Sequence, residues 1–303
     1  MRKVLITGIT GFIGSHLAEE LISAGLEIVG LKRKESNTWR NRAYQDKIHW
    51  VDIDDEGTYK EYLLSLNLDI IIHSAWIGVE ASDRDDWQQQ AKNIGFLVDL
   101  LEVAKLSSVN KIIFLGSQAE YGTINGKVDE SYIPDPSTAY ASVKLACLQI
   151  LKTYCKINGI SWVWLRIFSV FGERENNNWL IPSTVKQMTT GFEMKLTGGE
   201  QKYAYMYVKD VASIITKIAM CEVQSDIYNI SSSELRSIKS ILESIKEYVK
   251  PDFKLDFGAL PYRENQPMHI EGDCQKIRSQ IGELQFTNFN VALKRTLDYY
   301  LKT

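Results

Sequence analysis

The four cysteines of this 303-residue chain form no CxxC pair: they are Cys147, Cys155, Cys221 and Cys274. Such scattered thiols argue against a cysteine-based metal site, so we expect no bound metal and a reduced, cytoplasmic protein. The chain also lacks a block of Lys and Arg, and its formal net charge is −3. Nucleic acids and anionic membranes bind concentrated basic surfaces, so neither is an expected partner.

Long apolar runs are absent as well. No stretch approaches the roughly 18 consecutive apolar residues that a membrane-spanning helix needs. The apolar run near the N-terminus, Val4 to Ile6, is far too short for the core of a signal peptide and leads directly into a glycine turn. With 45% hydrophobic residues, the chain is long and apolar enough to bury a full α/β core.

What the sequence does contain is a regular alternation of short β-branched runs and amphipathic stretches. The predicted strands are Lys3 to Ile6, Glu27 to Gly30, His49 to Val51, Asp69 to His73, Lys111 to Leu115 and Trp162 to Ile167. The predicted helices include His16 to Ala24, Ala91 to Ser107 and Tyr140 to Asn158. This spacing is typical of βαβ units and predicts an α/β fold with a Rossmann-like, doubly wound parallel sheet. Ligands bind such sheets at the carboxyl ends of the strands.

The pattern changes after about Phe168, where a polar stretch at 173–178 follows and regular βαβ spacing is lost. We therefore predict a dinucleotide-binding Rossmann domain over residues 1–168, with approximately 205–230 returning to its sheet. Residues 169–204 and 231–303 are predicted to form a smaller C-terminal lobe that binds the substrate.

A glycine-rich turn joins the first predicted strand to the first helix, and it reads Gly8-Ile9-Thr10-Gly11-Phe12-Ile13-Gly14. The pyrophosphate of a dinucleotide binds at such a place, on free backbone N–H groups and the positive end of the helix. Glycines also form ordinary tight turns, but the position between strand and helix favours a cofactor site. The expected cofactor contacts are Gly8, Thr10, Gly11, Phe12, Ile13 and Gly14.

The end of the second strand indicates which dinucleotide binds. NAD enzymes place an acidic residue there for the ribose 2′-OH, whereas cations accommodate the 2′-phosphate of NADP. Here the chain has Lys32 and Arg33 and no Asp or Glu, and both cations can donate charge-assisted hydrogen bonds to a phosphate. The predicted cofactor is therefore NADP(H), and the alternative is a solvated charged loop.

Four further residues are placed to meet the cofactor. Asp52 and Ile53 end the third predicted strand, where the adenine is expected. Ala75 follows the fourth strand and Asn93 lies in the next helix, where both are expected to flank the middle of the cofactor. The alternatives are a solvated Asp and an Asn that only caps or packs.

Tyr140 and Lys144 stand four residues apart in the motif YASVK, so they share one face of a predicted helix. A nearby ammonium favours the phenolate and lowers the pKa of the phenol toward the range of an acid/base catalyst. The YxxxK pattern alone is common by chance. Ser117 gives it weight, because this residue follows the strand Lys111 to Leu115 and places a hydroxyl at the same edge of the sheet.

These motifs resemble those of the extended short-chain dehydrogenase/reductase family, in its group of nucleotide-sugar epimerases, dehydratases and reductases. The matching segments are TGITGFIGSHL at the start, GSQAEYG at 116–122, YASVK, LRIFSVFG at 165–172, YVKDVA at 207–212 and DCQKI at 273–277. The resemblance implies that Tyr140 is the general acid/base at a sugar oxygen, that Lys144 modulates its pKa and binds the nicotinamide ribose, and that Ser117 is a second hydrogen-bond donor.

The resemblance also implies that the C-terminal lobe binds a nucleotide sugar. Arg263 is the expected diphosphate ligand, with a structural ion pair as the alternative. Ser169 and Tyr203 depart from the family pattern, which has Asn and Arg at these positions. Trp179 and Tyr203 are candidates to stack on a base or sugar, although alternating aromatic residues are more often one face of a strand. The expected substrate contacts are Ser117, Gln118, Ser169, Trp179, Tyr203 and Arg263.

Similar enzymes form homodimers through a four-helix interface, so a homodimer is expected here. The helix after Ala91 and the helix that carries Tyr140 would supply its apolar faces. The alternative is that these faces only pack on the sheet.

The residues after Ser117 narrow the reaction. Family dehydratases carry an Asp-Glu pair there, and Gln118 and Ala119 cannot replace its acid/base chemistry. Epimerases of the group usually carry the acidic ribose contact that is missing here. We therefore predict NADPH-dependent reduction of the C4 ketone of a nucleoside-diphosphate 4-keto-6-deoxyhexose, with Tyr140 as proton donor. The alternatives are a nucleotide-sugar 4-epimerase and a regulator that senses dinucleotide without turnover.

Overall fold

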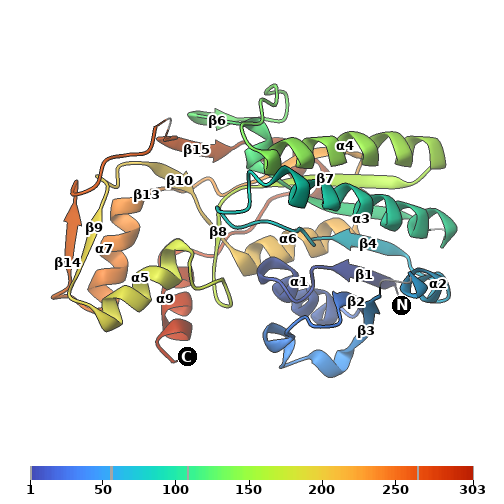
Figure 1. Ribbon diagram of the computed structural model, residues 1–303, viewed down its shortest axis with the longest axis horizontal. Coiled ribbons are helices and arrows are strands. Elements are labelled where there is room, and N and C mark those ends of the chain that lie inside the picture. The colour runs from blue at the N-terminus through green and yellow to red at the C-terminus, as the bar shows by residue number, and fades with distance from the viewer. Residues whose placement is uncertain (1, 55–56, 108, 265, 303) are drawn as a thin grey trace.

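The computed structural model describes residues 2–54, 57–107, 109–264 and 266–302. Its largest sheet has seven parallel strands in the order β12-β7-β5-β4-β1-β2-β3 (Figure 1). They are β1 (Lys3–Thr7), β2 (Glu27–Arg33), β3 (Ile48–Ile53), β4 (Ile70–His73), β5 (Lys111–Ser117), β7 (Ser161–Ile167) and β12 (Asp226–Ile230). The predicted Rossmann-like sheet is confirmed, and the carboxyl ends of its strands lie along one edge.

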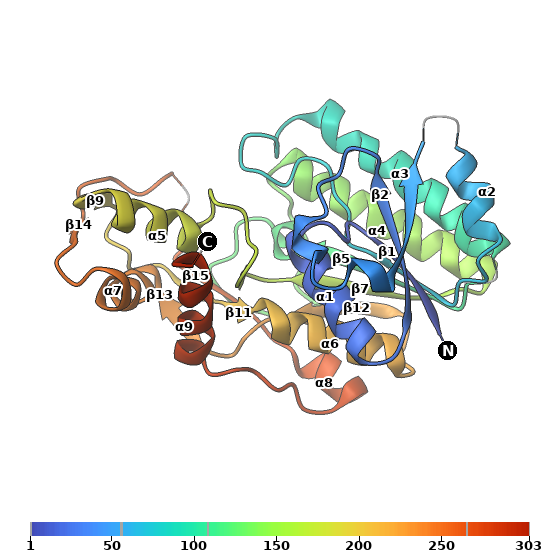
Figure 2. The same ribbon diagram turned by 90° about the horizontal axis from the view of Figure 1, so that it is seen from below.

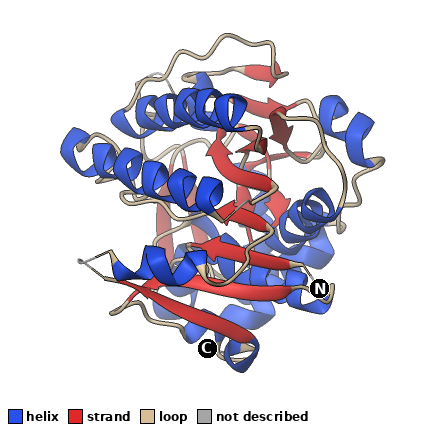
Figure 3. Ribbon diagram, turned by 90° about the vertical axis from the view of Figure 1, so that its right-hand side faces the viewer, coloured by secondary structure: helices blue, strands red, loops and turns tan. Residues whose placement is uncertain are grey.

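Helices cover both faces of this sheet (Figure 3). They are α1 (Phe12–Ser23), α2 (Thr58–Leu64), α3 (Trp87–Leu106), α4 (Ala139–Asn158) and α6 (Val208–Met220). In β1, Val4 and Ile6 join the hydrophobic cluster of α1 and α6, whereas Leu5 joins the cluster of α3 and α4. Because successive side chains of a strand point to opposite faces, a strand covered on both faces is apolar throughout.

Most of the other elements form a smaller lobe beside the large sheet (Figures 1 and 2), whereas the helix Gln275–Ile281 packs against β12. One small sheet has the order β13-β10-β15-β6, and two strand pairs, β11-β8 and β14-β9, accompany it. These strands are β6 (Gly126–Val128), β8 (Val170–Phe171), β9 (Glu193–Leu196), β10 (Lys202–Ala204), β11 (Met206–Tyr207), β13 (Leu235–Ser237), β14 (Lys254–Phe257) and β15 (His269–Gly272). The remaining α-helices are α5 (Leu180–Thr190), α7 (Ile238–Val249), α8 (Gln275–Ile281) and α9 (Phe289–Tyr300). Three of them, α5, α7 and α9, bury a common core.

The segment 173–178 connects this lobe to the glycine turn of the large sheet. Arg174 donates a hydrogen bond to the carbonyl oxygen of Arg40 at 2.8 Å, and Arg40 donates to the carbonyl oxygen of Arg174 at 2.7 Å. Arg40 also donates to the carbonyl oxygen of Thr10, at 3.3 Å. Arg174 has a left-handed φ of 66°, and its side chain reaches Nδ1 of His16 at 2.6 Å. Such a backbone conformation persists only where surrounding contacts hold it, as these do.

Glu175 lies in the same segment and is only 8% exposed. Burial raises the pKa of its carboxyl to about 8. The backbone of this residue is hydrogen-bonded, because the hydroxyl of Tyr300 donates to the Glu175 carbonyl oxygen at 3.2 Å. The folded protein therefore holds the Glu175 side chain in its protonated, neutral form more strongly than the unfolded chain does.

We predict that wild-type stability falls as the pH rises from about 4.5, the ordinary pKa, to about 8, because only the unfolded chain releases the Glu175 proton in this range. Glu175→Gln cannot ionise, so above pH 8 its free energy of unfolding should exceed that of the wild type, by at most about 5 kcal/mol. Below pH 4.5 the two proteins should be similar. Urea unfolding across this range measures the difference, and parallel pH profiles would contradict the prediction.

Candidate active site

The glycine turn between β1 and α1 is closely packed along its backbone. Gly8 has a φ of +67°, and a Cβ there would lie 2.5 Å from the backbone nitrogen of Ala75. A Cβ on Gly14 would lie 2.1 Å from the carbonyl oxygen of Gly8. Gly11 is the N-cap of α1, which has no side-chain cap and no acidic residue in its first turn. The uncapped, positive helix end fits the pyrophosphate of a dinucleotide.

Three other predicted contacts in the turn have partners within the fold. Thr10 accepts the hydrogen bond from Arg40 through its carbonyl oxygen. The Phe12 ring lies edge-on to the His16 ring, with centroids 5.9 Å apart. Ile13 packs against the hydrophobic clusters of both the large sheet and the lobe. The start of α1 is therefore fixed by packing as well as by backbone geometry.

The residues predicted to select the cofactor lie at the ends of β2 and β3. Strand pairing sets Lys32 opposite Asp52 and Arg33 opposite Ile53. The ammonium of Lys32 forms an ion pair with the carboxylate of Asp52, so part of its charge is already compensated. Arg33 is exposed and forms no ion pair with any residue that the structure describes. Arg33 is therefore the more available cation for a 2′-phosphate.

Ala75 and Asn93 lie beside the loop that follows β4. The N–H of Ala75 donates to Oγ1 of Thr7 at 3.2 Å. Asn93 is 2% exposed, and its side chain accepts from the N–H of Ile77 at 2.8 Å and donates to the Ile77 carbonyl at 3.1 Å. Asn93 thus orders this loop, and its contact with the cofactor remains a prediction.

Arg40 is a site residue that no sequence motif marked. It lies in the 3-10 helix η1 (Trp39–Asn41), after β2. Besides its contacts with Thr10 and Arg174, its guanidinium donates to Oδ1 of Asn176 at 2.6 Å. Burial lowers the pKa of Arg40. A partly desolvated cation therefore lies directly beside the glycine turn.

Ser117, Tyr140 and Lys144 converge at the carboxyl end of β5. Ser117 ends that strand, and the other two come from the first turns of α4. A hydrogen bond with Ser117 lowers the pKa of the Tyr140 hydroxyl, although burial has the larger effect and raises it. The ammonium of Lys144 donates to the carbonyl oxygen of Leu115 at 2.7 Å. The structure therefore brings the three predicted catalytic residues together.

Burial dominates the charge state of this cluster. It lowers the pKa of Lys144 to about 7. The Lys144 ammonium lies 3.8 Å from the centroid of the Trp76 ring and 5.8 Å from that of the Tyr140 ring. Ser117 and Arg84 lower the pKa of Tyr140, and the effect expected of Lys144 on that pKa stays a prediction.

A buried ion pair lies beneath Ser117 and was not predicted from the sequence. Oε2 of Glu120 is 2.9 Å from Nε of Arg166, and the two side chains are 0% and 1% exposed. Oε1 of Glu120 accepts from the backbone N–H of Ser117 at 2.7 Å. The Trp164 indole donates to the same carboxylate at 3.0 Å. The pair therefore fixes the backbone that carries the Ser117 hydroxyl.

The predicted substrate contacts near Ser117 differ in their surroundings. Gln118 begins the 3-10 helix η3 (Gln118–Tyr121), and its buried Oε1 has no hydrogen-bond partner among the described residues. The carbonyl oxygen of Ser169 accepts from the N–H of Met206 at 2.8 Å. Trp179 precedes α5 and is 39% exposed. Gln118 thus offers an acceptor and Trp179 an accessible ring to a ligand.

Tyr203 and Arg263 both lie in the smaller lobe. The Tyr203 hydroxyl donates to the carbonyl of Pro267 at 3.1 Å and accepts from the Gln266 amide at 2.7 Å. Burial raises the pKa of Tyr203, and the charge of the exposed Arg263 opposes this effect. The position of Tyr203 is therefore fixed, while the Arg263 guanidinium is accessible.

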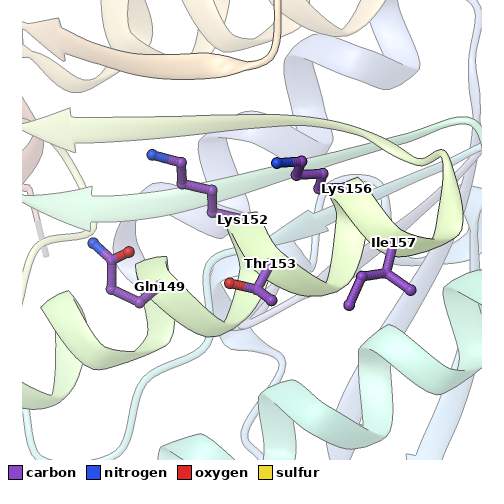
Figure 4. Close-up of a pocket in the computed structure, with 5 residues that line it drawn as sticks. All are labelled: Gln149, Lys152, Thr153, Lys156 and Ile157. Atoms are coloured by element: carbon purple, nitrogen blue, oxygen red, sulfur yellow. The ribbon is translucent and has the colours of Figure 1, made fainter.

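A shallow hollow on α4 lies away from these residues (Figure 4). It is lined by Gln149, Lys152, Thr153, Lys156 and Ile157. None of the predicted catalytic or cofactor contacts lines it.

Over the described ranges, no group of His, Cys, Asp and Glu could hold a metal ion. Nor is any described helix both long and apolar enough to cross a membrane.

Residues 4–231 match the family described as NAD dependent epimerase/dehydratase. The chain belongs to this family. It is therefore an enzyme of the oxidoreductase type with a dinucleotide-binding fold. The matched region contains the glycine turn, Ser117 and the YASVK motif. The predicted resemblance to extended short-chain dehydrogenases is thereby confirmed.

Individual relatives carry several activities. The chain is 27% identical to the CDP-abequose synthase of Salmonella muenchen, over 88% of this chain and 87% of that protein. It resembles the UDP-N-acetylglucosamine 4-epimerase of Methanobrevibacter ruminantium in fold, with a TM-score of 0.89 at 24% identity over 99% of this chain and 98% of the other. The UDP-glucuronic acid 4-epimerase of Bacillus cereus, solved with UDP-glucuronic acid and NAD, has a TM-score of 0.86 at 25% identity, with 99% of each chain covered.

Proposed function

We propose that this enzyme reduces the C4 ketone of a nucleoside-diphosphate 4-keto-6-deoxyhexose with NADPH. The proposal rests on the residues at the end of β2. Lys32 and Arg33 lie there, where NAD enzymes have an acidic residue that hydrogen-bonds the ribose 2′-OH. The carboxylate of Asp52, opposite Lys32 on the neighbouring strand, is paired with Lys32. We assign the dinucleotide to the large sheet, formed by residues 1–168 and about 205–230, and the nucleotide sugar to the lobe formed by 169–204 and 231–303.

When bound, NADPH supplies the hydride that adds to C4 of the sugar. Tyr140 then donates its hydroxyl proton to the oxygen at C4, and Ser117 donates a hydrogen bond to the same oxygen. Lys144, on the same face of α4 as Tyr140, would bind the nicotinamide ribose. Gln118 and Trp179 contact the sugar nucleotide, with Arg263 on its diphosphate and Ser169 and Tyr203 beside it.

Elimination of water is excluded from the proposal by the residues after Ser117. An amide at Gln118 and a methyl group at Ala119 cannot supply the acid and base that a 4,6-dehydration needs. The one carboxylate of this turn, that of Glu120, is buried in its pair with Arg166. It is therefore not available to the substrate.

A 4-epimerase is the second candidate. Two solved structures that share this fold are 4-epimerases, and the same Ser117, Tyr140 and Lys144 would serve that reaction. An epimerase returns the hydride to the opposite face of the sugar and consumes no cofactor. Consumption of NADPH therefore separates the two candidates.

Purified protein is expected to oxidise NADPH when given one member of a panel of dTDP-, CDP-, GDP- and UDP-linked 4-keto-6-deoxyhexoses. Tyr140→Phe should lower the rate by about 10²- to 10⁴-fold, because the proton donor is lost. Absorbance of NADPH follows the reaction, and ordinary UDP-hexoses are incubated in parallel. Interconversion of a UDP-hexose without NADPH consumption would identify an epimerase instead.

The preference for NADPH over NADH is expected to depend on Arg33. Arg33→Gln should weaken NADPH binding by about tenfold or more, because a charge-assisted hydrogen bond to the 2′-phosphate is lost. NADH binding should stay unchanged, since NADH has no such phosphate. Fluorescence titration with both nucleotides measures this, and Lys47→Gln is the control because Lys47 is exposed after η1. Equal losses for both nucleotides would contradict the role of Arg33.

We further propose a homodimer formed through α3 and α4. Val98 and Ile157 on these helices are 38% and 76% exposed, and the hollow of Figure 4 adjoins Ile157. Val98→Asp should convert the dimer to a monomer, because it places a charge within an apolar contact. Sedimentation equilibrium measures the mass. A monomeric wild type would refute the proposal.

A further inference from the structure

The loop between β4 and α3 covers the start of the helix that carries Tyr140. The backbone N–H of Tyr140 donates to the carbonyl oxygen of Arg84 at 2.8 Å. The neighbouring carboxylate of Asp85 accepts from the N–H of Ala139 at 3.3 Å. Two consecutive loop residues therefore bind the first turn of α4, and the loop is fixed relative to the phenol.

The Arg84 side chain lies against the Tyr140 ring. The guanidinium carbon is 5.1 Å from the ring centroid, within the range of a cation–π contact. Nε of Arg84 donates to the carbonyl oxygen of Val79 at 3.1 Å, within the same loop. This hydrogen bond orients the guanidinium, so that the contact with Tyr140 does not depend on a freely rotating side chain.

The Arg84 charge is not neutralised by the acidic residues around it. Asp83 accepts from the hydroxyl of Ser82, Asp85 binds α4, and Asp86 caps α3 by accepting from the N–H of Gln89. No described carboxylate forms an ion pair with Arg84. A full positive charge therefore faces the buried phenol.

Three other polar groups face Tyr140 from the elements packed on it. Ser117 at the end of β5 forms a hydrogen bond with the phenol and lowers its pKa. Glu120 in η3 raises that pKa, but its carboxylate is paired with Arg166. Lys144 in α4 donates to the carbonyl of Leu115 and lies 3.8 Å from the centroid of the Trp76 ring, with the Tyr140 ring farther away at 5.8 Å. Arg84, at 5.1 Å, is thus the cation nearer to the Tyr140 ring.

We propose that Arg84 is a positioning residue for proton transfer, which stabilises the phenolate of Tyr140 and so makes Tyr140 an effective acid/base. This inference rests on the proposed use of Tyr140 as proton donor. It assigns to the β4–α3 loop a role that the sequence motif gives to Lys144. Loss of the Arg84 charge leaves a weaker acid at the sugar oxygen, and proton donation slows.

The first experiment needs no substrate. Wild type, Arg84→Lys and Arg84→Gln are titrated with base, and each is compared with the same protein carrying Tyr140→Phe. The difference in near-ultraviolet absorbance isolates the Tyr140 phenolate. We expect Arg84→Gln to titrate at higher pH than the wild type, and Arg84→Lys to titrate close to it. Lys92→Gln is the control, because it removes an exposed charge from α3.

Identical titrations of all three proteins would overturn the inference. So would an equal shift in Arg84→Lys and Arg84→Gln, since the effect would then come from the loop rather than from the charge. In single-turnover reduction, Arg84→Gln should be slower by about tenfold, with its high-pH limb moved to higher pH and NADPH binding unchanged. If the wild type reduces no keto sugar, the proposed reaction fails, while the titration still decides the role of Arg84.

Discussion

The catalytic edge of the sheet depends on the buried ion pair between Glu120 and Arg166. Their atoms lie 2.9 Å apart with almost no exposure, and removal of one partner from such a pair costs about 3–5 kcal/mol. The pair also fixes its surroundings: Glu120 binds the Ser117 N–H and the Trp164 indole. Gly116 is required beside it, because a Cβ there would lie 2.1 Å from the Trp164 nitrogen. The GSQAEYG motif thus packs tightly and fixes the position of the Ser117 hydroxyl.

Next to this ion pair, burial disfavours the charged forms of both Tyr140 and Lys144. It raises the pKa of the Tyr140 phenol and lowers that of the Lys144 ammonium to about 7. A helical spacing of four residues therefore does not by itself create a phenolate–ammonium pair. The charge on the phenol depends on what the other elements bring to it, which here are the Ser117 hydroxyl and the Arg84 guanidinium. Local sequence supplies the groups, and the tertiary fold sets their chemistry.

The sequence was sufficient for features that depend on short-range pattern. The strands, the glycine turn and the convergence of Ser117 with Tyr140 follow from periodicity and from the rule that parallel strands end at one edge. Arg84, Arg40 and Glu120 were missed because their roles come from partners far away in the chain, such as Arg166 for Glu120. Lys32 and Asp52 were each predicted as cofactor contacts, yet their mutual pairing depends on the register of β2 against β3. Such register is not visible in either segment alone.

The segment 173–178 is bound to the glycine turn, where the cofactor is proposed to bind. A reductase must exchange its oxidised cofactor in every cycle, whereas an epimerase retains it. Here Arg40 and Arg174 join the segment to the glycine turn, and Asn176 reaches Glu80 of the β4–α3 loop at 3.3 Å. Each of these hydrogen bonds has a charged partner, an Arg guanidinium or the Glu80 carboxylate, and such bonds contribute about 1.5–3 kcal/mol each. The segment is thus firmly held beside the glycine turn, and the choice between the two reactions rests on the chemistry at the ends of β2 and β5.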